Sequence, residues 1–128
     1  MAKTALELTP GEREVYHPLQ MIEQRRKVDS VRIDERWELA QRIVRQAASM
    51  LYEKYGAERV VLFGSAADRP SFTLWSDIDL AAWGILPERF FATVAALTCL
   101  SGEIRIDLVD PEHCSPALSN AIQEGVVL

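Results

Sequence analysis

Apolar residues recur every three or four positions between about residues 31 and 55, which is the repeat of an amphipathic helix. The positions that form this stripe are Trp37, Ala40, Val44, Ala47, Leu51 and Tyr55. Gly56 follows the last of them, and glycine is the usual residue just beyond a helix C-terminus. The pattern therefore predicts a helix that runs from about Val31 to Tyr55 and packs one face against a core.

The residues before this helix predict a helical extension. A first helix is expected over residues 10–17, because its start has a helix-capping pattern. The residues of that pattern are Thr9, Pro10 and Glu12. Pro18 ends this helix, and a second helical stretch is expected over residues 19–28. We therefore divide the chain into an N-terminal helical extension, residues 1–30, and a domain, residues 31–128.

Short apolar runs alternate with turn-forming residues after Gly56. Strands are expected over residues 59–63, 77–83 and 104–109, a turn of helix and a loop over residues 65–75, and helices over residues 87–100 and 115–125. The first two strands lie too close in sequence for a helical crossover, so we expect antiparallel neighbours. This order predicts an α/β (α+β) fold in which helices flank a short mixed β-sheet.

The charge of the chain is divided unevenly. The formal net charge is −5. Residues 1–56 hold ten Lys and Arg against nine Asp and Glu, whereas residues 57–128 hold four Arg and no Lys against ten Asp and Glu. A domain that grips a long nucleic acid needs basic residues to replace the counterions of the phosphates. We therefore expect no nucleic-acid partner, and acids that are either solvated or bound to metal ions.

Other features concern the place of the protein in the cell. No apolar run reaches the roughly 18 residues needed to cross a bilayer, and Glu7 precedes any apolar segment of a secretory signal. The cysteines, Cys99 and Cys114, have no metal-binding spacing, and Cys99 lies in an apolar helical stretch, where we expect a buried free thiol. These observations predict a cytoplasmic protein without a membrane partner.

Asp77 and Asp79 are the first candidates for chemistry. Positions i and i+2 of a strand project from the same face, so the two carboxylates are expected side by side. Without a cation they would repel each other, and one would take up a proton. Mg²⁺ favours carboxylate and phosphate oxygens and would remove this repulsion. A solvated strand end is the alternative interpretation of the pair alone.

Two further features extend this pair to a candidate site. Gly64 and Ser65 follow a predicted buried strand, at what resembles a helix N-terminus. There a glycine allows close backbone approach, and amides favour phosphate. Asp107 lies in mid-strand between apolar neighbours and needs a charge partner or a metal. Three carboxylates are able to hold two metal ions that activate an attacking oxygen and neutralise a triphosphate. Asp110 is a looser candidate, interpreted as a loop acid.

The motif Leu62-Phe63-Gly64-Ser65, followed by Ser76-Asp77-Ile78-Asp79-Leu80, resembles the DNA polymerase beta-like nucleotidyltransferase superfamily. The small size of the chain is similar to that of the minimal nucleotidyltransferases, called MNT proteins. The resemblance spans about residues 58–128 and implies the mixed-sheet nucleotidyltransferase fold. It also implies Mg²⁺-dependent transfer of a nucleoside monophosphate, with AMP from ATP as the expected case and two metal ions as the expected number.

The same resemblance implies roles for single residues. Asp77 and Asp79 match the metal-binding pair, and Asp107 matches the third acid, which would help to deprotonate the acceptor hydroxyl. The residues expected to contact the nucleotide are Gly64, Ser65, Arg69 and Ser76.

One departure from the family pattern affects the phosphate turn. The family often has Gly-Ser-x-Ala-Arg-Gly, whereas here Asp68 stands at the arginine position and Arg69 at the second glycine position. An acid beside a triphosphate opposes binding, so we expect Arg69 to compensate by turning toward the phosphates.

Three functions remain open from the sequence. The first is adenylyl transfer to a hydroxyl of a partner protein, and the resemblance to MNT proteins implies a HEPN-domain toxin as that partner. The second is a non-catalytic module that neutralises or scaffolds a partner by binding. An apolar face in the extension would then dock on a partner or on a second copy, and its residues are Tyr16, Leu19, Met21 and Ile22. The third is transfer to a cationic small molecule, as in aminoglycoside-modifying relatives.

Overall fold

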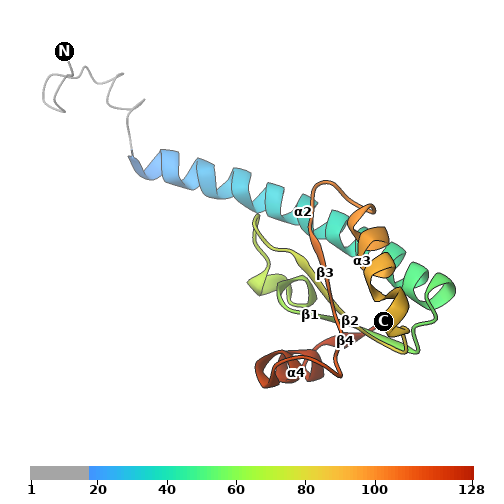
Figure 1. The fold of residues 1–128 in the computed structure, drawn as a ribbon. Coiled ribbons are helices and arrows are strands. Elements are labelled where there is room, and N and C mark those ends of the chain that lie inside the picture. Colours follow the sequence, from blue (N-terminus) through green and yellow to red (C-terminus); the bar gives the residue numbers. More distant parts are fainter. Residues whose placement is uncertain (1–17) are drawn as a thin grey trace, which may run out of the picture. The chain divides into compact units, whose positions relative to one another are not determined.

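The structure is a computed structural model that describes residues 18–128 (Figure 1). The chain divides between Arg32 and Ile33 into two units, and the second unit, Ile33–Leu128, contains the sheet. The predicted helix over residues 10–17 lies outside the described residues. No helix among residues 18–128 combines the length and apolarity that crossing a membrane requires.

The first described helix, α2, runs from Pro18 to Lys54 without interruption. The predicted break between residues 28 and 31 is therefore wrong. Valine, aspartate and serine at positions 28–30 are weak helix formers, but each costs only about 0.5 kcal/mol, and no glycine or proline lies between residues 19 and 55. The predicted end is confirmed, because Gly56 has a φ of 71° and the Ala57 N–H donates to the Leu51 carbonyl at 3.0 Å.

Four strands form one mixed sheet in the order β3-β2-β1-β4. Their bounds are Arg59–Phe63 (β1), Ile78–Trp83 (β2), Ile106–Val109 (β3) and Val126–Val127 (β4). β1 pairs antiparallel with β2 and β4, whereas β2 and β3 are parallel. The expected mixed sheet and its antiparallel first pair are confirmed. Sequence reasoning missed β4, because two residues are too few to show an alternating pattern.

Helical segments connect the strands. Two 3₁₀ turns (Ser65–Ala67 and Arg69–Ser71) join β1 to β2, and a third (Pro87–Arg89) leads into α3 (Phe90–Thr98). Helix α4 (Pro116–Gln123) precedes β4, and the Ser115 hydroxyl caps it by accepting from the Leu118 N–H. Cys99, just after α3, is exposed, so its predicted burial is wrong.

The sheet of the second unit has a hydrophobic layer on each face. Ala40, Val44, Ala47 and Leu51 of α2 are buried with Leu97 of α3 on one face. Ile122 of α4 packs with Val61, Phe63 and Ala81 on the other. The predicted packing stripe is thus confirmed. Both faces are covered, and the end of β1 that carries the Gly-Ser turn lies beside the start of β2.

Candidate functional site

Strand pairing brings two of the predicted acids together. Phe63 at the end of β1 pairs with Asp79 on β2, and Asp79 in turn pairs with Asp107 on β3. Directly paired residues project from the same face of a sheet, so the Asp79 and Asp107 carboxylates are neighbours. Asp77 had been expected within the strand. It lies one residue before β2 begins, at the end of the preceding loop, and adjoins the pair from there.

The electrostatics of the acids agree with this placement. Partial burial raises the pKa of the Asp79 carboxyl, and the negative charges of Asp107 and Asp77 raise it further, whereas Arg105 opposes the shift. Among the described residues, no hydrogen bond is donated to the side chain of Asp77 or Asp79. Asp107 is different, because Arg105 Nε donates to its Oδ1 at 2.9 Å. The repulsion around Asp79 is therefore only partly relieved by the protein itself.

Gly64 lies directly against the Asp79 carboxylate. Its φ of 74° and ψ of −158° belong to a region that is essentially restricted to glycine. A Cβ atom on Gly64 would lie 2.5 Å from Asp79 Oδ2, which no real contact of this kind allows. Both the backbone conformation and the nearby carboxylate therefore favour glycine at position 64. Without a side chain, the turn backbone approaches Asp79 closely.

Ser65 begins a single 3₁₀ turn, not a longer helix. The Asp68 N–H donates to the Ser65 carbonyl at 3.2 Å, and the helical segment ends there. Such a short segment contributes little macrodipole, so that part of the predicted phosphate attraction is weaker than expected. What remains for a phosphate is the Ser65 amide and hydroxyl beside a close-lying glycine backbone.

The loop that follows is closed by its own side chains. The Ser71 hydroxyl donates to Asp68 Oδ2 at 2.5 Å, which holds this acid in the loop. The Ser76 hydroxyl accepts from the Thr73 N–H at 2.9 Å and is buried, so it closes the turn before Asp77. A nucleotide contact by Ser76 stays a prediction. Trp75 in the same loop is 87% exposed.

Arg69 is engaged away from the turn. Its Nη2 donates to Asp34 Oδ1 of α2, and its guanidinium lies 6.0 Å from the centre of the Trp37 ring. A phosphate contact by Arg69 stays a prediction, and it requires that the arginine leave Asp34. Both side chains of this ion pair are more than one third exposed, where such pairs contribute only about 0–1 kcal/mol.

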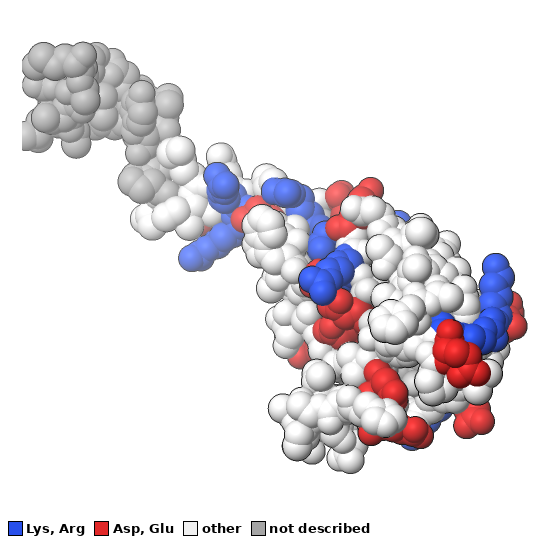
Figure 2. Space-filling view, in the orientation of Figure 1, with Lys and Arg blue, Asp and Glu red and all other residues white. Residues whose placement is uncertain are grey.

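A groove of about 570 Å³ adjoins the acids. Asp77 and Asp107 line it, together with Arg105, Glu103 and apolar side chains that include Ile104. Its charged side chains are three acids and one arginine, in line with the excess of acids over basic residues in this half of the chain. Figure 2 shows several groups of acidic side chains on one face of the protein. This surface suits a cationic or hydroxyl-bearing ligand better than a polyanion.

Metal binding by these acids stays a prediction, and the chemistry and arrangement of their side chains bear on it differently. The donors are hard carboxylate oxygens whose repulsion is only partly relieved, which fits Mg²⁺. Yet among residues 18–128 no three Asp, Glu, His or Cys side chains converge into a ready-made metal site. Mg²⁺ usually takes one or two protein carboxylates and completes its shell with water and substrate phosphates, so a ready-made trio is not required.

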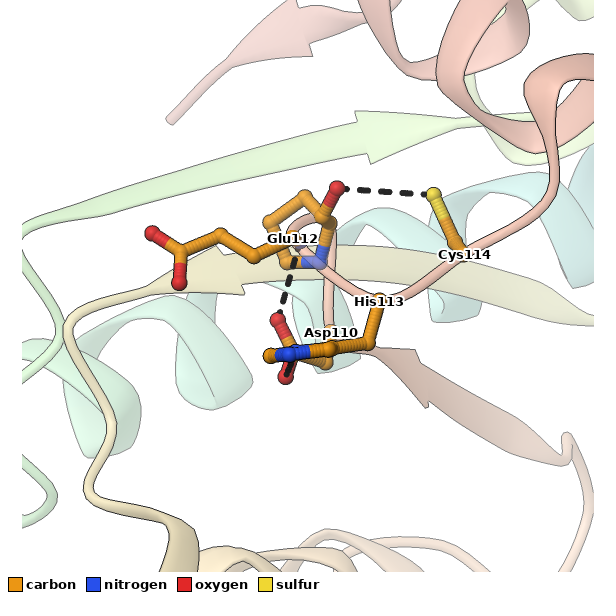
Figure 3. Close-up of polar contacts among 5 residues, drawn as sticks. Asp110, Glu112, His113 and Cys114 are labelled. Atoms are coloured by element: carbon orange, nitrogen blue, oxygen red, sulfur yellow. Dashed lines mark hydrogen bonds and ion pairs between the residues drawn. The ribbon is translucent and has the colours of Figure 1, made fainter.

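Asp110 lies in a turn after β3 and has its own partners (Figure 3). Its carboxylate contacts His113 Nδ1 and the Glu112 N–H, at 2.9 and 3.0 Å. The contact with His113 lowers the pKa of Asp110, and the same contact raises the pKa of His113. Cys114 donates to the Pro111 carbonyl at 3.5 Å. This local network accounts for Asp110 as a turn-forming acid.

Sequence reasoning missed the residues that α2 contributes here. Asp34 contacts Arg69 across 35 positions of sequence, and Arg36 donates to the Ser76 carbonyl across 40. Both stand on the polar part of an amphipathic helix, where charged residues are the rule. No local signal marks them.

Comparison with known proteins places this geometry in context. No protein-family model matches the sequence, and no curated protein matches it. A solved structure of a candidate minimal nucleotidyltransferase is similar, with a TM-score of 0.57 and 27% sequence identity. The match covers 72% of this chain and 95% of that one. With its mixed four-stranded sheet and flanking helices, the chain therefore has a nucleotidyltransferase fold.

Proposed function

We propose that the protein is a Mg²⁺-dependent nucleotidyltransferase that transfers AMP from ATP to a hydroxyl group. The observation that carries the proposal is the juxtaposition of Asp79, Asp107 and Asp77 with the Gly64 backbone. Acids whose repulsion is only partly relieved, beside a glycine turn, favour a site for a cation and a triphosphate. The nucleotidyltransferase fold supports the same reaction class.

Each group has a role in this proposal. Asp77 and Asp79 would hold Mg²⁺, which supplies charge neutralisation on the triphosphate when bound. The Gly64 and Ser65 backbone would orient the phosphates. Asp107 would accept the proton of the acceptor hydroxyl, whose oxygen forms a bond to the α-phosphorus. The bond from that phosphorus to the bridging oxygen breaks, and pyrophosphate leaves.

We further propose that the acceptor is a protein. As this acceptor we propose a HEPN-domain toxin, which the sequence resemblance to MNT proteins implies, with this protein as its antitoxin. The acidic groove beside Asp77 and Asp107 suits a segment with basic flanking residues rather than a nucleic acid.

Label transfer tests the proposal directly. The protein is incubated with α-labelled ATP, Mg²⁺ and the product of the neighbouring gene, and label on that partner is measured. We expect transfer by the wild type and none above background by Asp77→Asn. Absence of label on the partner with the wild type, or equal label with Asp77→Asn, would refute the proposed activity.

The Arg69 ion pair leads to a second prediction, measured by titrating ATP and Mg²⁺ calorimetrically. If Arg69 leaves Asp34 to bind phosphate, Arg69→Ala should weaken binding about tenfold, since a charge-assisted hydrogen bond contributes about 1.5–3 kcal/mol. Asp34→Asn should tighten binding a few-fold, because it removes the competing carboxylate. Arg45→Ala, an exposed arginine of the same helix, serves as control. Unchanged affinity in the Arg69 and Asp34 variants would exclude a phosphate role for Arg69.

A non-catalytic module remains the second candidate, favoured by apolar residues on the first part of α2. The large apolar side chains exposed there are Leu19, Met21, Ile22, Val28 and Val31. Tyr16, also expected on this face, lies outside the described residues. If binding alone neutralises the partner, Asp79→Asn should neutralise as well as the wild type, whereas removal of residues 1–28 should abolish complex formation. A complex that survives this truncation would exclude the segment as the docking surface.

A further inference from the structure

We propose that Arg36 is a positioning residue that sets the separation between Asp77 and Asp107, an inference that rests on the proposed function. Arg36 Nη2 donates to the Ser76 carbonyl at 2.8 Å, and Nη1 donates to the Glu103 carbonyl at 3.4 Å. Ser76 immediately precedes Asp77, and Glu103 lies in the segment that leads to Asp107. One guanidinium therefore bridges the two chain segments that carry these acids into the site.

The Arg36 hydrogen bonds connect the two segments that lead into β2 and β3. β2 and β3 are parallel, so no tight turn joins their starting ends. Their first cross-strand contact is the hydrogen bond from the Ile78 N–H to the Arg105 carbonyl, at 2.9 Å. Arg36 contacts Ser76 and Glu103, which precede this hydrogen bond in the two segments that lead into the strands, and Arg105 in turn contacts Asp107. A shift of either segment would move one acid relative to the other.

The contacts of the Arg36 side chain agree with a positioning role. Among the described residues no carboxylate forms an ion pair with it, and both of its hydrogen bonds there are to backbone carbonyls. Its Nε is buried and has no hydrogen-bond partner within residues 18–128. An unpaired buried donor is costly, yet the planar fork keeps both carbonyl contacts. Arg36 contacts none of the three carboxylates in this structure, so it acts through Ser76 and Glu103.

The test compares Arg36→Ala, Arg36→Lys and Arg36→Gln with Arg42→Ala, which removes an exposed arginine from the same helix. Two measurements are made well below the melting temperature of each variant. The first is the backbone amide chemical shifts of Asp77, Ile78 and Asp107 in the metal-free protein. The second is the affinity for Mn²⁺ alone, by electron paramagnetic resonance, because Mn²⁺ favours the same carboxylate oxygens as Mg²⁺.

We expect Arg36→Ala to shift these amides and to weaken Mn²⁺ binding about tenfold, the usual scale for loss of an outer partner of metal ligands. Arg36→Lys and Arg36→Gln should show smaller changes of both kinds, because each keeps a donor but not the fork, and Arg42→Ala should show neither change. Unmoved amides in the Arg36 variants, with lower thermal stability only, would overturn the inference. If Arg36→Ala does not fold, the lysine and glutamine variants decide by the same criterion. A wild type that binds no Mn²⁺ would refute the proposed function, whereas the amide shifts would still test the position of the segments.

Discussion

Asp79→Asn should reduce nucleotidyl transfer about a thousandfold, which corresponds to about 4 kcal/mol of barrier height. Asp79 stands at the centre of the site, since it pairs with Asp107 across the sheet and lies against Gly64. Asparagine keeps the shape of the side chain but loses the charge that would hold Mg²⁺. The same substitution should raise the stability of the metal-free protein, because it removes a poorly compensated negative charge.

The sign of this stability change follows from the pKa. Burial and the neighbouring acids raise the pKa of Asp79, so the folded state binds its proton more tightly than the unfolded state does. Protonation therefore stabilises the fold at pH values below the ordinary carboxyl pKa, and this contribution is lost as the pH rises through the raised pKa of the folded state. At neutral pH the charged carboxylate destabilises the metal-free protein, and Asp79→Asn relieves that cost.

Thermal unfolding across pH checks this expectation. Without metal, Asp79→Asn should melt higher than the wild type at pH 7 by on the order of 2 °C, and the difference should vanish in acid. Adding Mg²⁺ should stabilise the wild type and not the variant. Glu112→Gln serves as control, because it removes one exposed charge outside the site. If Asp79→Asn keeps full transfer activity, or melts lower at pH 7, Asp79 does not have the proposed role.

The parts of the site that could be predicted from the sequence are those that depend on residues close together along the chain. Phe63 and Asp79 lie on two strands with a short connection, and Gly64 directly follows the first strand. The shortness of this connection was enough to predict antiparallel neighbours, so that the turn and the acid would meet. Asp107 was predicted because an acid in mid-strand needs a charge partner or a metal, and Arg105 supplies a charge partner at 2.9 Å. The placement of Asp77 just before β2 was not predicted, because strand ends depend on pairing with β3.

The remaining features depend on contacts between segments far apart in sequence. Arg36 and Asp34 reach the loop before β2 from α2, and an arginine or aspartate on a polar helix face carries no local signal of such a contact. The ion pair between Arg69 and Asp34 could not be predicted for the same reason. The uninterrupted α2 shows the opposite limit, in which weak local propensity predicted a break that helical continuity overrides.

Gly64→Ala is expected to damage the site and the fold together. The backbone at this position is in a glycine-only region, so alanine costs about 1–3 kcal/mol of stability if the turn keeps its shape. The added methyl group would also lie 2.5 Å from Asp79 Oδ2, so either the turn or the carboxylate must move. Binding of ATP with Mg²⁺ should therefore fall at least tenfold, because both the phosphate turn and an acid lose their positions.

Two other glycines separate the effect on the site from the effect on stability. Gly56 has a φ of 71° with nothing within 4 Å of an added Cβ, so Gly56→Ala imposes backbone strain far from the acids. Gly84 has a φ of 90°, and an added Cβ would lie 3.0 Å from the Glu58 backbone nitrogen, so Gly84→Ala imposes strain and a clash outside the acid cluster. Melting temperature and ATP titration in the presence of Mg²⁺ are measured for all three variants. All should melt lower than the wild type, yet only Gly64→Ala should lose nucleotide affinity at a temperature where each is folded. Equal loss of affinity in the three variants would mean that general destabilisation, rather than the approach of Gly64 to Asp79, explains the result.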